Sequence, residues 1–139
     1  MTEASSPQAA AMVRRIYDEA NVDPLNMAFI LDLYAPEFLH NGRPMSAAMW
    51  KRMAESVYGS FPDAKQEIKD LSVEGDLVWT RYVMRGTHTG SLTLRDRVVP
   101  ATGKRFEVWG MEMRRIEGGK FVELWSSDVM GQLLPQLER

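Results

Sequence analysis

The chain has 139 residues, of which 45% are hydrophobic and 26% are charged, and its net charge at pH 7 is −2. This length predicts one domain over residues 1–139 that buries a sizeable core without crosslinks. Lysine and arginine are scattered rather than clustered, which argues against nucleic-acid binding, and no apolar run is long enough to span a membrane.

Two features bear on chemistry and location. The chain has no cysteine, which excludes thiol nucleophiles, disulfides and iron–sulfur clusters. Its N-terminal stretch, MTEASSPQAAAM, lacks the basic segment of a signal peptide. We therefore expect a cytoplasmic protein that has no membrane partner.

The first half of the chain predicts helices. Ser6 can cap a helix that has Pro7 at its first position, and apolar residues recur after it with a helical period. Asp23-Pro24 repeats this start signal and predicts a second helix through MAFILDLYA that stops at Pro36. The segment PEFLHNGRP then indicates a short strand or an extended turn.

A third helix is predicted from Ser46 through AAMWKRMAESVYGS, until Phe61-Pro62-Asp63 breaks it. Its expected inward stripe is Met49, Trp50, Met53 and Val57. From residue 65 the apolar period changes to two, which favours strands over 65–74, 77–89, 92–99, 105–116 and 121–128. The expected fold is therefore α+β, with N-terminal helices packed on a strongly curved antiparallel sheet that forms a conical cavity.

The last two strands flank Gly118-Gly119, a pair that favours a tight hairpin turn. With these glycines at its centre, Glu117 lies opposite Lys120, and the pairs that follow are Met113 with Leu124, Met111 with Ser126, and Trp109 with Asp128. One face then carries Trp109, Met111, Met113, Val122, Leu124, Ser126 and Asp128, because side chains alternate along a strand. The other face carries Arg114 and Glu123, with Glu112 beside Trp125.

Asp128 is the candidate acid or base, because this pairing places it on the more apolar face. A carboxylate held against apolar surface can exchange protons near neutral pH. The alternative is that Asp128 only caps the helix that follows, VMGQLLPQL.

Several short motifs occur in a characteristic order, and together they resemble the SnoaL-like polyketide cyclase family, which has the nuclear-transport-factor-2-like fold. The resemblance covers about residues 10–138. The motifs are Phe61-Pro62-Asp63, Gly75-Asp76-Leu77-Val78, Arg85-Gly86-Thr87-His88-Thr89-Gly90, Ala101-Thr102-Gly103-Lys104-Arg105, Arg115-Ile116, Gly119-Lys120, Glu123-Leu124-Trp125 and Gln136-Leu137.

The resemblance implies an enzyme that closes a ring by intramolecular aldol condensation without a metal or organic cofactor. The family's acid/base aspartate, at the end of the last long strand, is matched by Asp128 when counted back from Gly131. Counted forward from Trp125, the position falls on Val129, and a lost bulge would explain the difference. The fold also hosts epoxide hydrolases, isomerases, hydroxylase-like proteins and non-catalytic binders, so these remain alternatives.

The two histidines, His40 and His88, are further catalytic candidates. Their number excludes a three-histidine metal site. Two histidines and a carboxylate could still form a site, but no pair of these ligands has helical spacing, so no metal is expected. His40 precedes Asn41-Gly42 and either contacts a ligand at the cavity mouth or lies on a surface turn. His88 either points into the cavity or bonds neighbouring backbone.

The expected ligand is a small apolar or aromatic polyketide-like molecule, and the expected assembly is a homodimer. Asp128 would take the acidic proton between two substrate carbonyls, while His40 or Tyr82 polarises a carbonyl. The dimer would form through the open face of the sheet, at Trp79, Val83 and Arg85. The candidate ligand-binding residues are Tyr17, Met49, Trp50, Met53, Tyr82, Trp109, Met111, Met113 and Ser126.

Overall fold

The computed structural model describes residues 6–139, so part of the N-terminal stretch in which we expect no signal peptide lies outside the described residues. The helices are α1 (Ser6–Val22), α2 (Phe29–Leu33), α3 (Ala47–Gly59) and α4 (Met130–Leu137). The strands are β1 (Tyr34–His40), β2 (Arg43–Ser46), β3 (Lys65–Glu74), β4 (Leu77–Thr87), β5 (Leu92–Thr93), β6 (Val98–Val99), β7 (Arg105–Glu117) and β8 (Lys120–Ser126).

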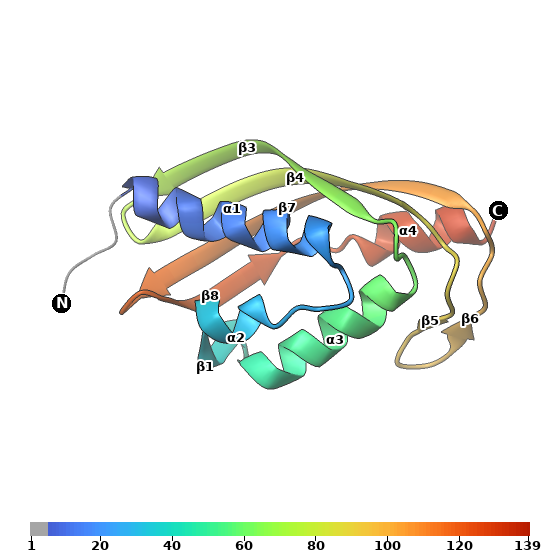
Figure 1. Ribbon diagram of the computed structural model, residues 1–139, viewed down its shortest axis with the longest axis horizontal. Helices are drawn as coiled ribbons and strands as arrows, with labels where there is room; N and C mark the ends of the chain where they lie inside the picture. Colours follow the sequence, from blue (N-terminus) through green and yellow to red (C-terminus); the bar gives the residue numbers. More distant parts are fainter. Residues whose placement is uncertain (1–5) are drawn as a thin grey trace.

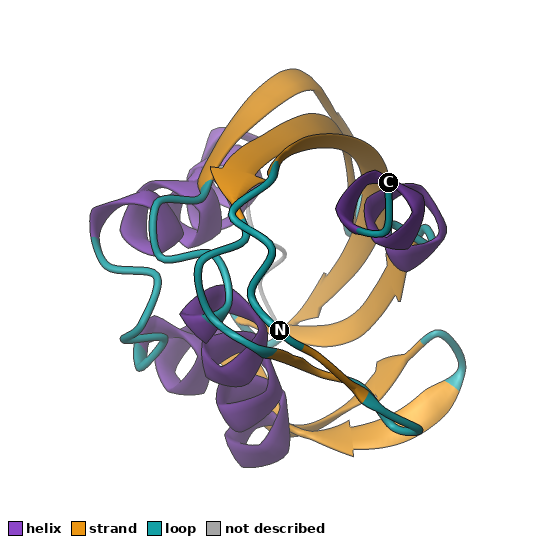
Figure 2. Cartoon of the chain, turned by 90° about the vertical axis from the view of Figure 1, so that its right-hand side faces the viewer, coloured by secondary structure: helices purple, strands orange, loops and turns teal. Residues whose placement is uncertain are grey.

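The main sheet has the strand order β2-β1-β8-β7-β4-β3, and all its pairs are antiparallel except β1 with β8. The sheet curls around the side that α1 and α3 cover (Figures 1 and 2). Bulges at Lys69 in β3 and Val122 in β8 add one unpaired residue each, and such bulges bend a strand and increase its twist. The α+β class with helices on a curved sheet is therefore confirmed, although the sheet contains one parallel pair.

The second helix is much shorter than predicted, because the segment from Tyr34 joins the sheet as β1. The Asp23 side chain accepts a hydrogen bond from the Leu25 backbone N–H (3.0 Å), which makes a local turn instead of a helix cap. β1 pairs with β2 on one side and with β8 on the other. The local hairpin with β2 and the long-range pairing with β8 together outweigh the helical pattern of the sequence at Tyr34 and Ala35.

The third helix begins as predicted, with the Ser46 side chain accepting a hydrogen bond from the Met49 backbone N–H (3.1 Å). Its inward face differs from the predicted stripe. Trp50, Ala54, Val57 and Tyr58 pack against the core, whereas Met49 and Met53 are exposed. The predicted strand over 92–99 is also divided, because β5 and β6 form a separate two-stranded hairpin.

The last hairpin turns at Gly118-Gly119, both of which have positive φ, and Glu117 pairs with Lys120 as predicted. The bulge at Val122 then shifts the register by one residue. Met113 therefore pairs with Trp125, and Glu112 pairs with Ser126. A shift of one residue exchanges the two faces of a strand.

The predicted faces of β7 are consequently wrong. Glu112 and Arg114 line the inner side of the sheet, whereas Trp109 and Met111 are exposed on its outer side. Met113 alternates with Glu112 and Arg114, so it shares the outer side. Asp128 follows the end of β8 and has no strand partner in β7.

Candidate functional site

An outer cavity of about 580 Å³ lies between α3, the β1–β2 turn and the segment that joins β8 to α4. Its size is within the range usual for small-molecule sites, and apolar side chains with a few polar groups are typical of such sites. The lining residues are His40, Asn41, Trp50, Met53, Ala54, Val57, Tyr58, Ser126, Ser127, Asp128, Val129 and Met130.

Asp128 lines this cavity but is exposed to solvent at its rim. Its Oδ1 accepts a hydrogen bond from the Gly131 backbone N–H (3.2 Å), at the start of α4. The carboxylate therefore has the capping contact that the alternative interpretation predicted, and it also faces the cavity. A single carboxylate can do both, because it has two oxygens with several lone pairs.

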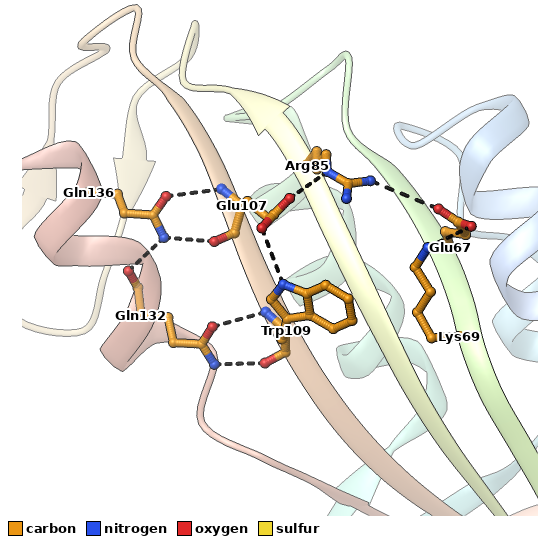
Figure 3. Close-up of polar contacts among 7 residues, drawn as sticks. All are labelled: Glu67, Lys69, Arg85, Glu107, Trp109, Gln132 and Gln136. Atoms are coloured by element: carbon orange, nitrogen blue, oxygen red, sulfur yellow. Dashed lines mark hydrogen bonds and ion pairs between the residues drawn. The ribbon is translucent and has the colours of Figure 1, made fainter.

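The position of Asp128 depends on how α4 is attached to β7. β8 pairs with β7 only from Glu112 onward, which leaves an open edge at the start of β7. Two glutamines of α4 occupy this edge (Figure 3). Gln132 bonds the backbone N–H (2.9 Å) and C=O (2.7 Å) of Trp109, and Gln136 bonds those of Glu107 (3.0 and 2.8 Å).

His40 lies at the end of β1, half-buried against the cavity. Its Nε2 is 2.9 Å from the Ser126 Oγ, and its ring lies 4.5 Å from that of Trp50. Burial lowers the pKa of His40, and the negative charge of Glu112 opposes this shift. The neutral form of the imidazole is therefore favoured at pH 7, and in this form one ring nitrogen donates a hydrogen bond and the other can accept one.

Asn41 and Gly42 hold His40 and Ser126 together. Both have positive φ, the signature of a tight hairpin turn between β1 and β2. The Asn41 side chain accepts a hydrogen bond from the Ser126 backbone N–H (2.8 Å) and donates one to its C=O (3.4 Å). His40 thus lies at the cavity mouth, one of its two expected positions.

His88 lies elsewhere and contacts neither cavity. Its side chain is buried, and its Nδ1 accepts a hydrogen bond from the Thr102 backbone N–H (3.3 Å) and is 3.0 Å from the Thr102 Oγ1. Its ring packs against Phe61. These contacts match the structural interpretation of His88, which connects the end of β4 to the loop before β7.

An inner cavity of about 120 Å³ lies deeper, between α1, α2, α3 and the sheet. It shares Trp50, Ala54 and Tyr58 with the outer cavity. Tyr17 and Tyr82, two of the predicted ligand-binding residues, line it. Of the other predicted residues, Met53 and Ser126 line the outer cavity, whereas Met49, Trp109, Met111 and Met113 line neither.

The inner cavity also contains charged residues that the sequence interpretation missed. The Arg114 guanidinium lies 3.2 Å from the Glu112 carboxylate, and their side chains are only 4% and 13% exposed. The Tyr17 hydroxyl donates to Glu112 Oε1 (2.6 Å), and Arg114 Nε donates to the Tyr34 hydroxyl (2.9 Å). Burial, together with the charge of Glu112, raises the pKa of Tyr17 well above its usual range. The sequence signal for this ion pair was a glutamate and an arginine two residues apart on one strand face. That face could be assigned to the inner side only after the bulge at Val122 was known.

Within residues 6–139, no group of three or more histidine, aspartate or glutamate side chains is arranged to hold a metal ion. None of helices α1–α4 combines the length and the apolar composition needed to cross a membrane. The polar groups of the outer cavity include His40, Ser126 and Asp128, and those of the inner cavity include Glu112, Arg114 and the tyrosines.

Solved structures with this fold come from several bacteria. AclR from Streptomyces galilaeus, provisionally assigned as a hydroxylase, is 26% identical with a TM-score of 0.82, and the match covers 96% of this chain and 98% of AclR. IdmH from Streptomyces antibioticus, provisionally assigned as a polyketide cyclase, is 27% identical with a TM-score of 0.77, covering 95% and 99% of the two chains. TsrD from Streptomyces laurentii shares the fold, with 21% identity, a TM-score of 0.81 and coverage of 97% and 98%. No curated protein sequence matches the chain.

Residues 11–137 match the SnoaL-like polyketide cyclase family. Because this match spans most of the chain, the protein belongs to that family, as the order of its motifs predicted.

Proposed function

We propose that the protein is an enzyme that closes a ring in a polyketide-like molecule by acid/base catalysis in the outer cavity. The observation that carries the proposal is that Asp128 lines an apolar cavity of about 580 Å³ together with His40 and Ser126. An apolar cavity of this size can fold a flexible chain so that two of its carbons meet. The chemistry needs no cofactor, because every step is a proton transfer or an intramolecular bond formation.

In the proposed reaction, the Asp128 carboxylate removes a proton from the carbon between two substrate carbonyls. The resulting enolate attacks a third carbonyl carbon, which forms the new carbon–carbon bond and leaves an alkoxide. Asp128 then returns its proton to that alkoxide, so the carboxylate is regenerated and no atom is gained or lost.

His40 and Ser126 support this reaction as hydrogen-bonding groups. With the neutral His40 Nε2 donating to Ser126 Oγ, the serine hydroxyl is free to donate to a substrate carbonyl. A donor aimed at a carbonyl stabilises the negative charge that develops there. His88 has no part in the reaction, because it contacts neither cavity.

Proton abstraction can be tested without the natural substrate. An aryl β-diketone in D₂O exchanges the proton between its carbonyls, and the wild-type protein should accelerate this exchange above the buffer rate. Asp128→Asn should abolish the acceleration, whereas the matched outward-facing change Glu123→Gln should preserve it. Equal exchange with wild type and Asp128→Asn would contradict the assignment of Asp128.

A second candidate is a reaction that activates water, such as the hydrolytic opening of an epoxide. It is favoured by Asn41, which lines the cavity with Asp128. Both ends of the Asn41 amide are engaged by the Ser126 backbone, however, which leaves it poorly placed to hold a water. Incorporation of ¹⁸O from labelled water into a product would support this candidate over cyclisation.

We further propose a cytoplasmic homodimer formed through the outer face of the sheet. Trp79 (44% exposed) pairs with Met113 across β4 and β7, and Met113 pairs with Trp125 (45% exposed) across β7 and β8. Large exposed apolar side chains in one row are typical of an interface. Of the three residues expected there, Val83 is only 1% exposed and cannot contribute much area.

A further inference from the structure

A row of polar side chains connects the outer cavity to the inner one. His40 in β1 contacts Ser126 in β8. Ser126 pairs with Glu112 in β7, and Glu112 pairs with Thr80 in β4. Residues paired across neighbouring strands have their Cβ atoms about 5 Å apart on the same face. A ligand in the outer cavity is therefore one strand away from the carboxylate of Glu112.

Within residues 6–139, the hydrogen bond to this carboxylate and its shortest ion-pair contact are made to the same oxygen, Oε1. Tyr17 donates to Oε1 at 2.6 Å, and Arg114 contacts the same atom at 3.2 Å. Among residues 6–139, no side chain or backbone group donates a hydrogen bond to Oε2, although the carboxylate lines the inner cavity. Glu112 therefore offers one unused acceptor to whatever enters this cavity.

The hydroxyl of Tyr82 is a second unused polar group in the inner cavity. Tyr82 lies over Gly110, where a side-chain carbon would be only 2.5 Å from the hydroxyl oxygen. Gly110 is two residues before Glu112 and on the same face of β7. Within the described part of the chain, the Tyr82 hydroxyl makes no hydrogen bond, and the charge of Glu112 contributes to raising its pKa, after burial.

The pair of groups suits one kind of ligand atom. A hydroxyl can donate its proton to Glu112 Oε2 and accept one from Tyr82, whereas an ether or a halogen cannot donate. The cavity volume of about 120 Å³ is slightly below the ~150 Å³ that holds a benzene molecule. It therefore admits the hydroxyl-bearing edge of one ring and excludes a fused ring system.

We propose that the inner cavity is a recognition subsite for a phenolic or enolic hydroxyl, held between Glu112 Oε2 and the Tyr82 hydroxyl. This inference rests on the proposed function, because it assigns the orientation of a polyketide-like substrate: one hydroxylated end lies in the inner cavity, and the reacting carbons lie beside Asp128. Tyr17 and Arg114 act as positioning residues that fix the Glu112 carboxylate through Oε1.

Binding of two probes of nearly equal size tests the subsite without turnover. Phenol can donate a hydrogen bond and fluorobenzene cannot, so wild type should bind phenol about tenfold more tightly, the ratio that a hydrogen bond to a charged group supports. Titrations followed by NMR give both affinities, and contacts from the phenol ring to Tyr17 and Ile16 protons locate the site. Equal affinities, or contacts confined to Met53 and Met130 of the outer cavity, would overturn the inference.

Two variants separate the groups involved. Glu112→Gln with Arg114→Met removes both charges together, because one charge left alone in the core is strongly destabilising. It should reduce the preference for phenol to less than about twofold, because the charged acceptor of the hydrogen bond is lost. Tyr82→Phe leaves the ion pair intact and should lower phenol affinity severalfold, so it keeps the test available if the double variant does not fold. The matched control Glu123→Gln should keep the tenfold preference. Unchanged preference in Tyr82→Phe and in a folded double variant would overturn the subsite.

Failure of the subsite and failure of the proposed reaction are distinguishable. The β-diketone exchange assay tests Asp128 in the outer cavity, whereas the probe titrations test Glu112 and Tyr82 in the inner cavity. Exchange that depends on Asp128, together with equal binding of the two probes, would leave the reaction standing and reject the subsite alone.

Discussion

The Gln132 side chain bonds the backbone of Trp109 as a neighbouring strand would, accepting from its N–H at 2.9 Å and donating to its C=O at 2.7 Å. Gln136 does the same for Glu107, one pair of residues further along the same edge. An open strand edge invites pairing with another chain. α4 therefore covers the edge of β7 and, through its first turn, fixes Asp128 at the cavity.

The first prediction concerns this attachment. Gln132→Leu removes both hydrogen bonds to Trp109 and should lower the free energy of unfolding by about 1–2 kcal/mol, the usual range for lost hydrogen bonds at a partly exposed site. Hydrogen exchange at the Trp109 amide should accelerate. Gln132→Glu keeps the acceptor for the Trp109 N–H and should lose less stability than Gln132→Leu. If Gln132→Leu and the wild type are equally stable in urea unfolding, α4 is held by its apolar side chains alone.

A second prediction concerns the close approach of β4 and β7 in the inner cavity. Gly110→Ala would place a carbon 2.4 Å from the Tyr82 ring and should destabilise the protein by about 1–3 kcal/mol through overpacking. In a Tyr82→Ala background the same change should cost much less, because the ring is absent. Additive costs in thermal unfolding would contradict this contact.

The third prediction is a dependence of stability on pH. Burial lowers the pKa of His40 in the folded protein below its unfolded value of about 6.5. The unfolded state then binds more protons in that window, so stability should be full above about pH 6.5 and fall as the pH drops through the folded pKa. The pKa of His88 is lowered by burial as well, so His40→Gln should remove only part of the effect. An NMR titration in which the His40 ring has a pKa above 6.5 would contradict it.

The fourth prediction tests the dimer. Wild-type protein should sediment at about twice the 15.8 kDa of one chain. Met113→Glu, in the centre of the row between Trp79 and Trp125, places a charge in the contact and should give a monomer. The same substitution on α1, Ala11→Glu, is a control that should leave the dimer intact. A wild-type protein that sediments as a monomer at micromolar concentration would refute the interface.

The parts of the fold that depend on local pattern were predictable from the sequence. The Ser46 cap, the Gly118-Gly119 turn and most of the strands after residue 65 follow from short-range signals, and the structure has them. The strand expected over 92–99 is the exception, because it is divided into β5 and β6. β1 was predicted only in part: Tyr34 and Ala35 were assigned to the second helix, and a strand was one of two expectations for the segment from Pro36. The reason is that β1 is stabilised by parallel pairing with β8, more than 80 residues away in the case of His40 with Leu124. Local sequence contains no information on such a partner.

The candidate site was predicted in part for a related reason. Asp128, His40, Trp50 and Met53 line the outer cavity, and the sequence had identified them. The bulge at Val122 was not visible in the pattern, because both registers place apolar residues on both faces of β7. With the uncorrected register, Glu112 and Arg114 lay on the face opposite Asp128, so the charged centre of the inner cavity could not be foreseen.

The central claim is that Asp128 transfers protons, and one pair of substitutions tests it most directly. Asp128→Asn keeps a side chain that can accept the hydrogen bond from Gly131, so folding and α4 should be unchanged. The β-diketone exchange rate should nevertheless fall by about 10²–10⁴-fold, the usual contribution of a general acid/base. Asp128→Ala should lose the same activity and, in addition, about 1 kcal/mol of stability. Full exchange activity in Asp128→Asn, with a loss of stability only in Asp128→Ala, would show that Asp128 is a helix cap and not a catalyst.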